Sequence, residues 1–221
     1  MPAKPLSLAL VLTLLALSAC STVYYHAMEK MGYHKRDILL TNVAKARDSQ
    51  QEAKQQFQTA LERFKALTRF HGGKLEDKYN QLKAEFDASQ AKADAVHKRV
   101  NDIEDVGEAL FREWETELGQ YSNAGLRQSS QRQLSVTRQR YDQLLAKMRK
   151  AESKIEPVLN TFRDQVLFLK HNLNAQAIAS LQGEVRGVEM DVSSLIKEME
   201  AAIREADTFI RSESKTQQQA S

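Results

Sequence analysis

The sequence has little of the residues that interrupt or cross-link a chain. Its 221 residues include one cysteine, Cys20, so no disulfide can form within the chain. Only three prolines and eight glycines occur, and Pro157 is the only proline after position 5. Because proline and glycine disfavour helices, whereas alanine, leucine, glutamine and most charged residues favour them, the composition predicts a mostly helical protein.

A strong excess of one charge is also missing. Lysine and arginine number 32, against 29 aspartates and glutamates, so the chain is close to neutral. A protein that binds nucleic acid usually carries a clear positive excess. We therefore predict that nucleic acid is not a partner.

The common motifs of catalytic, nucleotide and metal sites are absent as well. The sequence has no HExxH or GxSxG motif, and no two of its five histidines stand four residues apart. Gly72-Gly73-Lys74 is not followed by the serine or threonine of a phosphate-binding loop. We predict no catalytic residue, no metal site and no cofactor.

The first twenty residues are typical of a signal for export and lipid attachment. Residues 6–17 form an apolar run that has the length of a signal peptide and is too short to span a bilayer. The run ends in Leu17-Ser18-Ala19-Cys20, which resembles the lipobox of bacterial lipoproteins. We expect residues 1–19 to be a lipoprotein signal peptide, cut between Ala19 and Cys20, and Cys20 to carry acyl chains such as palmitate. The alternative is an ordinary signal peptide that ends near a cysteine.

The residues after Cys20 indicate where the chain is held. Ser21 stands where an aspartate would favour the inner membrane, so we expect the periplasmic face of the outer membrane. Residues 20–37 are expected to form a membrane-proximal connector, whose side chains either lie among lipid headgroups or pack on the base of the next domain. The side chains that suit both alternatives are Tyr24, Tyr25, Met28, Lys30, Met31, Lys35 and Arg36.

From Leu39 to Phe209, apolar residues recur at alternating spacings of three and four. This spacing places one side chain per turn on a single seam of a helix. Gln50 is the one polar member of the first seam, and a lone polar seam residue can fix the register of a bundle. We predict an all-α fold, an elongated antiparallel helical bundle or coiled coil of four long helices over residues 38–212. Residues 213–221 are polar and are expected to be a disordered tail.

Three polar interruptions divide the pattern into four segments. Gly72-Gly73 favours a tight reversal, and residues 119–130 are predicted to be a loop, with Ser129 or Ser130 as the cap of the next helix. Asn172 is interpreted as a helix end and Asn174 as the N-cap of the last helix. The competing arrangement joins the third and fourth segments into one helix of about 80 residues.

Pro157 lies inside the third segment. Proline removes one helix hydrogen bond, and its ring clashes with the preceding turn. We therefore expect a kink near residues 154–157.

Two places are candidate interaction sites. Lys170, His171, Asn172 and Asn174 form a dense polar group, which either binds a partner or ligand or caps the ends of two helices. Trp114, three residues after Phe111, is either part of the core or an anchor for a protein partner.

Beyond these patterns, the chain resembles a family of bacterial lipoproteins that share domain of unknown function 2959. The resemblance covers nearly all of the sequence after Cys20 and implies a helical periplasmic lipoprotein, but no activity. The residues that carry it are Met31-Gly32-Tyr33-His34-Lys35-Arg36-Asp37, Gly72-Gly73, Glu104-Asp105-Val106, Leu110-Phe111-Arg112-Glu113-Trp114-Glu115, Gln120-Tyr121-Ser122, Pro157-Val158-Leu159 and the run from Asp164 to Asn174.

Three functions remain open at the level of the sequence. We favour a lipoprotein with a structural or adaptor role, held to the membrane by its acyl chains and bound to a protein partner or a second copy. The alternative is a ligand-binding or enzymatic module that uses Lys170 to Asn174. A third hypothesis, a bundle that lies along the bilayer, would need basic residues gathered on one side.

Overall fold

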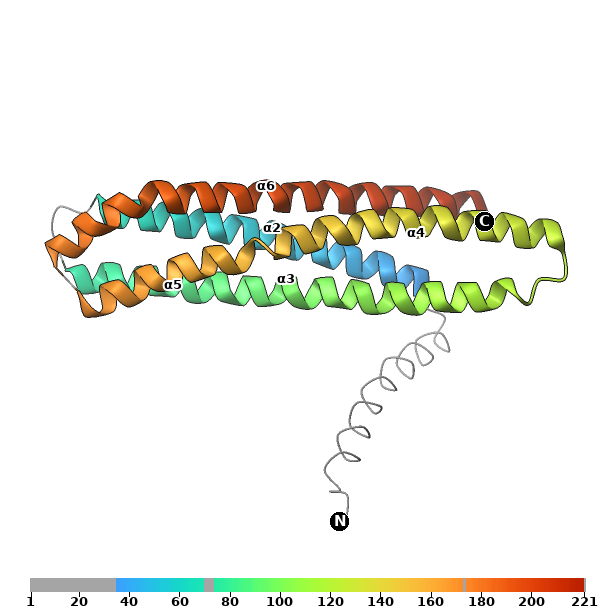
Figure 1. Cartoon of the computed structure of the whole chain (residues 1–221), viewed down its shortest axis with the longest axis horizontal. Helices are drawn as coiled ribbons and strands as arrows, with labels where there is room; N and C mark the ends of the chain where they lie inside the picture. The colour runs from blue at the N-terminus through green and yellow to red at the C-terminus, as the bar shows by residue number, and fades with distance from the viewer. Residues whose placement is uncertain (1–34, 70–73, 173, 221) are drawn as a thin grey trace, which may run out of the picture.

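The computed structural model describes residues 35–69, 74–172 and 174–220, and it shows a long bundle of helices (Figure 1). The helices are α2 (Lys35–Thr68), α3 (Leu75–Leu118), α4 (Ala124–Glu152), α5 (Ile155–His171) and α6 (Ala175–Ala220). No strand occurs in these three stretches. The predicted all-α bundle of four long helical arms is confirmed.

Helices α4 and α5 follow one another along the same arm, so five helices make four arms. The α2 arm packs against α3 and α6, and the α4–α5 arm also packs against α3 and α6. Successive arms run in opposite directions (Figure 1), as expected when the connections between them are short. The 44 residues of α3 alone give the bundle a length of about 66 Å at 1.5 Å per residue.

The seams predicted from the sequence face one another in the core. Buried seam residues run from Leu39 on α2 to Phe209 on α6. Phe64 and Phe162 meet edge to face across the core, with their ring centroids 6.5 Å apart. Each large apolar side chain taken out of water contributes roughly 1.5–3 kcal/mol, so these seams hold the arms together.

Gln50 is one of the polar residues buried in this core. Its side chain is 1% exposed, and neither its amide nitrogen nor its amide oxygen has a hydrogen-bond partner among the residues described. Leaving a buried polar group unpaired costs about 1–3 kcal/mol. The predicted place of Gln50 in the seam is confirmed, and its role in fixing the register stays a prediction.

The kink expected at Pro157 is a complete break. Helix α4 ends at Glu152, and α5 begins at Ile155. Pro157 has no N–H to donate to the carbonyl of Ser153, and its ring would clash with that carbonyl in a continuous helix. The two residues between the helices therefore lie just before the proline.

The turn between α5 and α6 decides between the two arrangements left open above. Helix α5 ends at His171 and α6 begins at Ala175, so the chain reverses and no helix of about 80 residues forms. The Asn174 side-chain oxygen accepts the N–H of Ala177 at 2.9 Å, and the Asn172 amide donates to the carbonyl of Phe168 at 2.9 Å. Both asparagines have the capping roles that the sequence predicted.

The loop between α3 and α4 is shorter than the predicted loop 119–130. Helix α3 ends at Leu118, and the N-cap of α4 is Asn123, whose side-chain oxygen accepts the N–H of Leu126 at 3.1 Å. Ser129 and Ser130 lie inside α4, so their prediction as caps is wrong. Asparagine is as effective an N-cap as serine, and the helix therefore starts at the earlier residue.

Both predicted ends of the bundle also need correction. Helix α2 begins at Lys35, inside the predicted connector 20–37, and the rest of that connector lies outside the residues described. Helix α6 continues through residues 213–220, which were expected to be a disordered tail. Glu213 stands one turn after Phe209 and is buried, which shows that the seam continues past the last apolar residue.

Gly107 is a point of close approach in the core. A Cβ atom at this position would lie 2.4 Å from two ring atoms of Tyr141 and 2.5 Å from its hydroxyl oxygen. A glycine in an apolar seam leaves a gap where the neighbouring seam positions have side chains. The structure shows instead that the missing side chain makes room for the tyrosine of α4.

Candidate functional site

The turn between α5 and α6 contains the predicted polar group of Lys170, His171, Asn172 and Asn174. The structure brings the four residues into one turn, where Asn172 is half-buried and the other three are exposed. Both asparagine side chains are engaged with backbone groups of the adjoining helices. These bonds favour the capping role over a ligand-binding role.

An open hollow lies between α5 and α6, close to this turn. Two carboxylates, Asp164 on α5 and Glu184 on α6, contribute to its lining, so the hollow is negatively charged. The complete lining is Asp164, Gln165, Phe168, Ser180, Leu181 and Glu184. None of the four predicted residues of the turn lines it.

Trp114 lies where α2 meets the α3–α4 hairpin. Its indole N–H donates to the hydroxyl of Ser130 on α4 at 2.8 Å, and the guanidinium carbon of Arg36 on α2 lies 4.9 Å from its ring centroid. Phe111, one turn earlier, is fully buried. The predicted pair therefore divides: Phe111 belongs to the core, whereas the half-buried Trp114 joins three helices at the edge of the core.

A partly buried ion pair lies next to this contact, one residue earlier on each of the two helices. The Lys35 ammonium, at the start of α2, lies 2.9 Å from a carboxylate oxygen of Glu113 on α3, and its side chain is 7% exposed. Lysine is rarely buried without a paired charge. The ion pair and the Arg36–Trp114 contact together fix the place where α2 enters the bundle.

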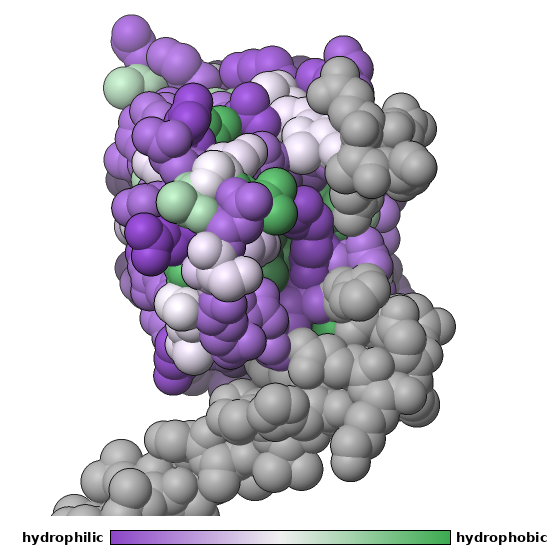
Figure 2. All heavy atoms as spheres, turned by 90° about the vertical axis from the view of Figure 1, so that its right-hand side faces the viewer, coloured by the Kyte–Doolittle hydropathy of each residue, from purple (hydrophilic) through white to green (hydrophobic). Residues whose placement is uncertain are grey.

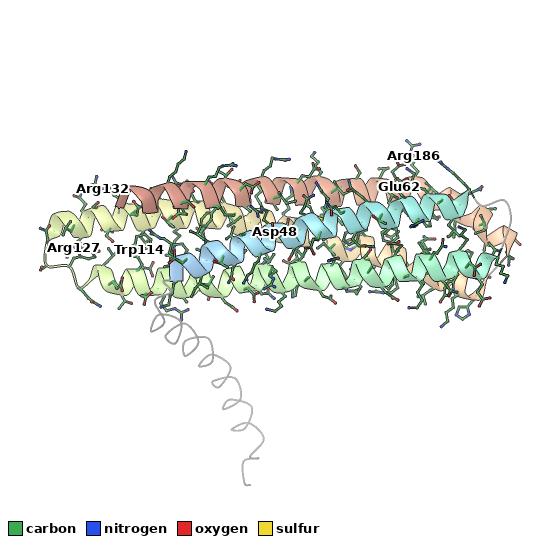
Figure 3. The ribbon with its side chains drawn as sticks, turned by 180° about the vertical axis from the view of Figure 1, so that it is seen from behind. Asp48, Glu62, Trp114, Arg127, Arg132 and Arg186 are labelled. Carbon is green, nitrogen blue, oxygen red and sulfur yellow. The ribbon has the colours of Figure 1, made fainter. Side chains whose placement is uncertain are left out.

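Beyond this entry point, the α3–α4 hairpin extends past the start of α2 and the end of α6 (Figure 1). Residues 119–129, which comprise the loop after α3 and the first turns of α4, are all exposed. Figure 3 shows that Trp114, Arg127 and Arg132 lie at this end of the molecule, whereas Arg186 lies at the opposite end. We call residues 118–132 the hairpin tip.

Two more polar side chains are buried in the core near this end. Glu213 on α6 is 1% exposed, and a guanidinium nitrogen of Arg140 on α4 lies 3.5 Å from its carboxylate. The hydroxyl of Thr137, one turn before Tyr141 on α4, has no hydrogen-bond partner among the residues described. Both side chains are part of the buried core.

The Tyr141 phenol has a strongly raised pKa. Burial is the main cause, because it disfavours the charged phenolate, and the negative charges of Glu104, Glu108 and Asp142 act in the same direction. The hydroxyl donates at 3.4 Å to the carbonyls of Ile103 and Glu104. With its proton held this firmly in the core, Tyr141 has a structural role.

The stretches 35–69, 74–172 and 174–220 hold no group of three or more histidine, cysteine, aspartate or glutamate side chains that could bind a metal ion. None of their helices is both long enough and apolar enough to cross a bilayer. Ala19 and Cys20, the predicted cleavage and lipid-attachment residues, lie outside the residues described. Their roles therefore stay predictions.

Sequence reasoning missed the residues that surround Trp114 and the character of the hairpin tip. The sequence predicts Ser130 as a possible cap of the helix after the loop. No local pattern could show that its hydroxyl accepts the indole N–H of Trp114 from another helix. A signal for the tip was present, however: from Leu118 to Tyr141 the sequence contains four arginines and no aspartate or glutamate.

A family model described as Protein of unknown function (DUF2959) matches residues 24–213. The match covers α2 to α5 completely, α6 up to residue 213 and part of the sequence before α2. No curated protein and no solved structure matches the chain. The predicted membership of the DUF2959 family is confirmed, whereas the lipoprotein character that the resemblance implies stays a prediction. Function has to be argued from the residues of this chain.

Proposed function

This chain belongs to the DUF2959 family of proteins of unknown function, and from its own residues we propose that it is a membrane-anchored periplasmic lipoprotein with a structural or adaptor role. The single observation that carries the structural role is the bundle itself. Buried seams hold its arms together from Leu39 on α2 to Phe209 on α6, and the side chains of Asn172, Asn174 and Trp114 are engaged in caps and helix contacts.

Charged groups between the arms support the same role. Arg47 on α2 lies 3.1 Å from Asp207 on α6, and Lys92 on α3 lies 2.7 Å from Glu52 on α2. Arg149 on α4 donates at 2.9 Å to the side-chain oxygen of Asn101 on α3. Such pairs at the edges of a seam favour one arrangement of the helices over others. A rigid rod of this kind is suited to hold a partner at a fixed distance from a surface.

Membrane anchoring is proposed from the sequence Leu17-Ser18-Ala19-Cys20. A cysteine at this position supplies the thiol that accepts a lipid, and two or more acyl chains give stable attachment. The test is Cys20→Ala in the full chain, followed by separation of membrane and soluble fractions. We expect the variant to leave the membrane fraction. Sedimentation unchanged from that of the natural chain would contradict the proposal.

The adaptor role is tested by cross-linking in cells. A photoreactive residue placed at exposed Met190 on α6, or at exposed Leu167 on α5, should capture a discrete protein species, identified by mass spectrometry. Capture of a second copy of this chain would indicate a homo-oligomer. If neither position yields a discrete product, an adaptor role through these surfaces is contradicted.

A ligand-binding module near the Lys170–Asn174 turn is the second candidate, because the hollow between α5 and α6 lies close to it. Its two carboxylates suit a cationic ligand. Asp164→Asn with Glu184→Gln would then abolish binding of such a ligand without lowering the melting temperature. A fall in the melting temperature would instead indicate that the carboxylates stabilise the bundle.

A further inference from the structure

The hairpin tip differs from the rest of the bundle, because neither α2 nor α6 lies beside the ends of α3 and α4 there (Figure 1). Helix α2 begins at Lys35, which pairs with Glu113, and five residues of α3 remain between Glu113 and the end of the helix at Leu118. At 1.5 Å per residue, the tip therefore reaches about 8 Å beyond the start of α2 before its loop begins.

Positive charge on the tip is not neutralised locally. Arg127 and Arg132 are exposed, and neither has an ion-pair partner among the residues that the structure describes. The next two arginines of α4 are both paired. Arg138 lies 2.5 Å from Glu115, and Arg140 lies 3.5 Å from Glu213. Glu117 is the last carboxylate before the tip, so the two unpaired arginines leave it with a positive excess.

Apolar and aromatic groups stand beside these arginines. Leu126 is 59% exposed and Tyr121 is 39% exposed, which makes Leu126 one of the most exposed large apolar residues described. Figure 2 looks onto this end of the molecule and shows separate hydrophobic areas within a hydrophilic surface. Tyrosine and arginine beside a single exposed leucine suit the headgroup region of a bilayer, where polar and apolar groups mix.

The position of the tip in the fold agrees with this chemistry. The tip lies at the end of the bundle where α2 starts, and therefore at the end to which the proposed lipid anchor is connected (Figure 1). Fourteen residues, 21–34, separate Cys20 from Lys35, and a chain of that length spans at most about 50 Å. An anchored bundle is thus close enough to the bilayer for its tip to touch the surface.

We infer that the hairpin tip is a second membrane contact, in which Arg127 and Arg132 bind anionic phospholipid headgroups while Leu126 and Tyr121 enter the interface. This inference rests on the proposed anchoring for the orientation of the bundle. Each arginine near an anionic surface raises the binding constant roughly fivefold. The two together are expected to favour the surface-bound tip about 30-fold.

The experiment uses the full chain, isolated from membranes and reconstituted into vesicles of phosphatidylcholine with or without phosphatidylglycerol. Leu126→Cys introduces a thiol at the tip for an environment-sensitive fluorophore, and Phe168→Cys introduces one at the far end of the bundle. An acylated Cys20 takes no label, so one label per chain is expected. Two labels per chain would show that the anchoring proposal has failed, separately from the inference about the tip.

With phosphatidylglycerol present, we expect the fluorophore at position 126 to be quenched by nitroxide-labelled lipid and the one at position 168 not to be. Adding Arg127→Gln and Arg132→Gln should reduce this quenching to the level of neutral vesicles, about a 30-fold loss of tip binding. The matched control is Arg186→Gln, an exposed arginine at the opposite end, which should change nothing.

Three results would overturn the inference. The first is equal quenching at positions 126 and 168, and the second is quenching at 126 that survives loss of both arginines. The third is a change in the fluorescence emission at position 126 that depends on protein concentration in the absence of lipid. Such a change would indicate that the tip binds a second copy of the chain. Circular dichroism of each variant shows that the bundle is intact, as expected for changes at exposed residues.

Discussion

At the scale of single residues, the core is sensitive where a small residue meets a large one. Gly107 and Tyr141 are the clearest case, because the tyrosine ring occupies the space that any side chain at position 107 would need. Packed cores respond to volumes as small as a methyl group. A tyrosine at position 141 of α4 therefore requires a glycine at position 107 of α3.

Gly107→Ala is expected to lower the free energy of unfolding by up to about 2 kcal/mol, because overpacking costs roughly 1–3 kcal/mol and alanine returns about 1 kcal/mol of helix propensity. Urea denaturation followed by circular dichroism measures the change. Gly187→Ala is the matched control, since a Cβ there meets nothing within 4 Å, and it should raise stability by up to about 1 kcal/mol. Equal effects at the two glycines would show that Tyr141 does not constrain position 107.

Tyr141 also predicts how stability depends on pH. Burial raises the pKa of its phenol, so above the ordinary tyrosine pKa of about 10 the unfolded chain loses this proton first. The folded state then binds more protons than the unfolded state, and stability falls as pH rises. We expect the natural chain to lose up to about 1.4 kcal/mol per pH unit relative to Tyr141→Phe above pH 10.

Denaturation of both proteins at a series of pH values tests this prediction. Lysines titrate in the same range, but they do so in both proteins and cancel in the difference. Parallel curves above pH 10 would mean that the phenol is not held neutral by the fold.

At the scale of helices, the ends are set by a few side chains. Asn174 and Asn123 start α6 and α4, and the missing N–H of Pro157 accounts for the break between α4 and α5. The cap at Asn174 also distinguishes a structural turn from a binding site, because a cap contributes to stability.

Asn174→Ala should therefore lower the free energy of unfolding by about 1 kcal/mol, because the N–H of Ala177 loses its acceptor. His171→Ala, in the same turn but with an exposed side chain, should change stability by less than about 0.5 kcal/mol. Thermal denaturation of the two variants gives the comparison. If Asn174→Ala leaves the melting temperature unchanged, the turn does not depend on this cap.

The helices themselves could be predicted from the sequence because the spacing of apolar residues is a local signal. Leu39, Phe57 and Phe64 lie on the seam as expected, and the paired asparagines mark the last turn. The errors concern helix ends. Glu213 extends a seam with a charged residue, and Asn123 precedes serines that have the same capping ability, so composition alone could not place either boundary.

The candidate site was predicted less well than the fold. Trp114 was identified, but Arg36 and Ser130, which hold it, come from other helices, and only the packing of the arms brings them together. Whether Arg127 and Arg132 of the tip are left unpaired depends on which residues the nearby carboxylates pair with. Long-range pairing of this kind leaves no spacing pattern in a single sequence.

At the scale of the whole molecule, the bundle is a rod. Small-angle X-ray scattering of the full chain in detergent is expected to give a maximum dimension well above that of a compact protein of the same length, since α3 alone spans about 66 Å. Circular dichroism should show more than about 80% helix, because almost all residues of the four arms are helical. A compact particle, or a clear strand signal, would contradict the bundle.

An even number of antiparallel arms has a practical consequence for labelling. The start of α2 and the end of α6 fall at the same end of the rod (Figure 1), so a fluorescent protein fused after Ser221 would report on the surroundings of the N-terminal arm. An epitope inserted next to Asn172, in the turn between α5 and α6, would instead lie at the opposite end of the bundle. Antibody access to these two tags in intact and permeabilised cells would therefore read out which way the rod points.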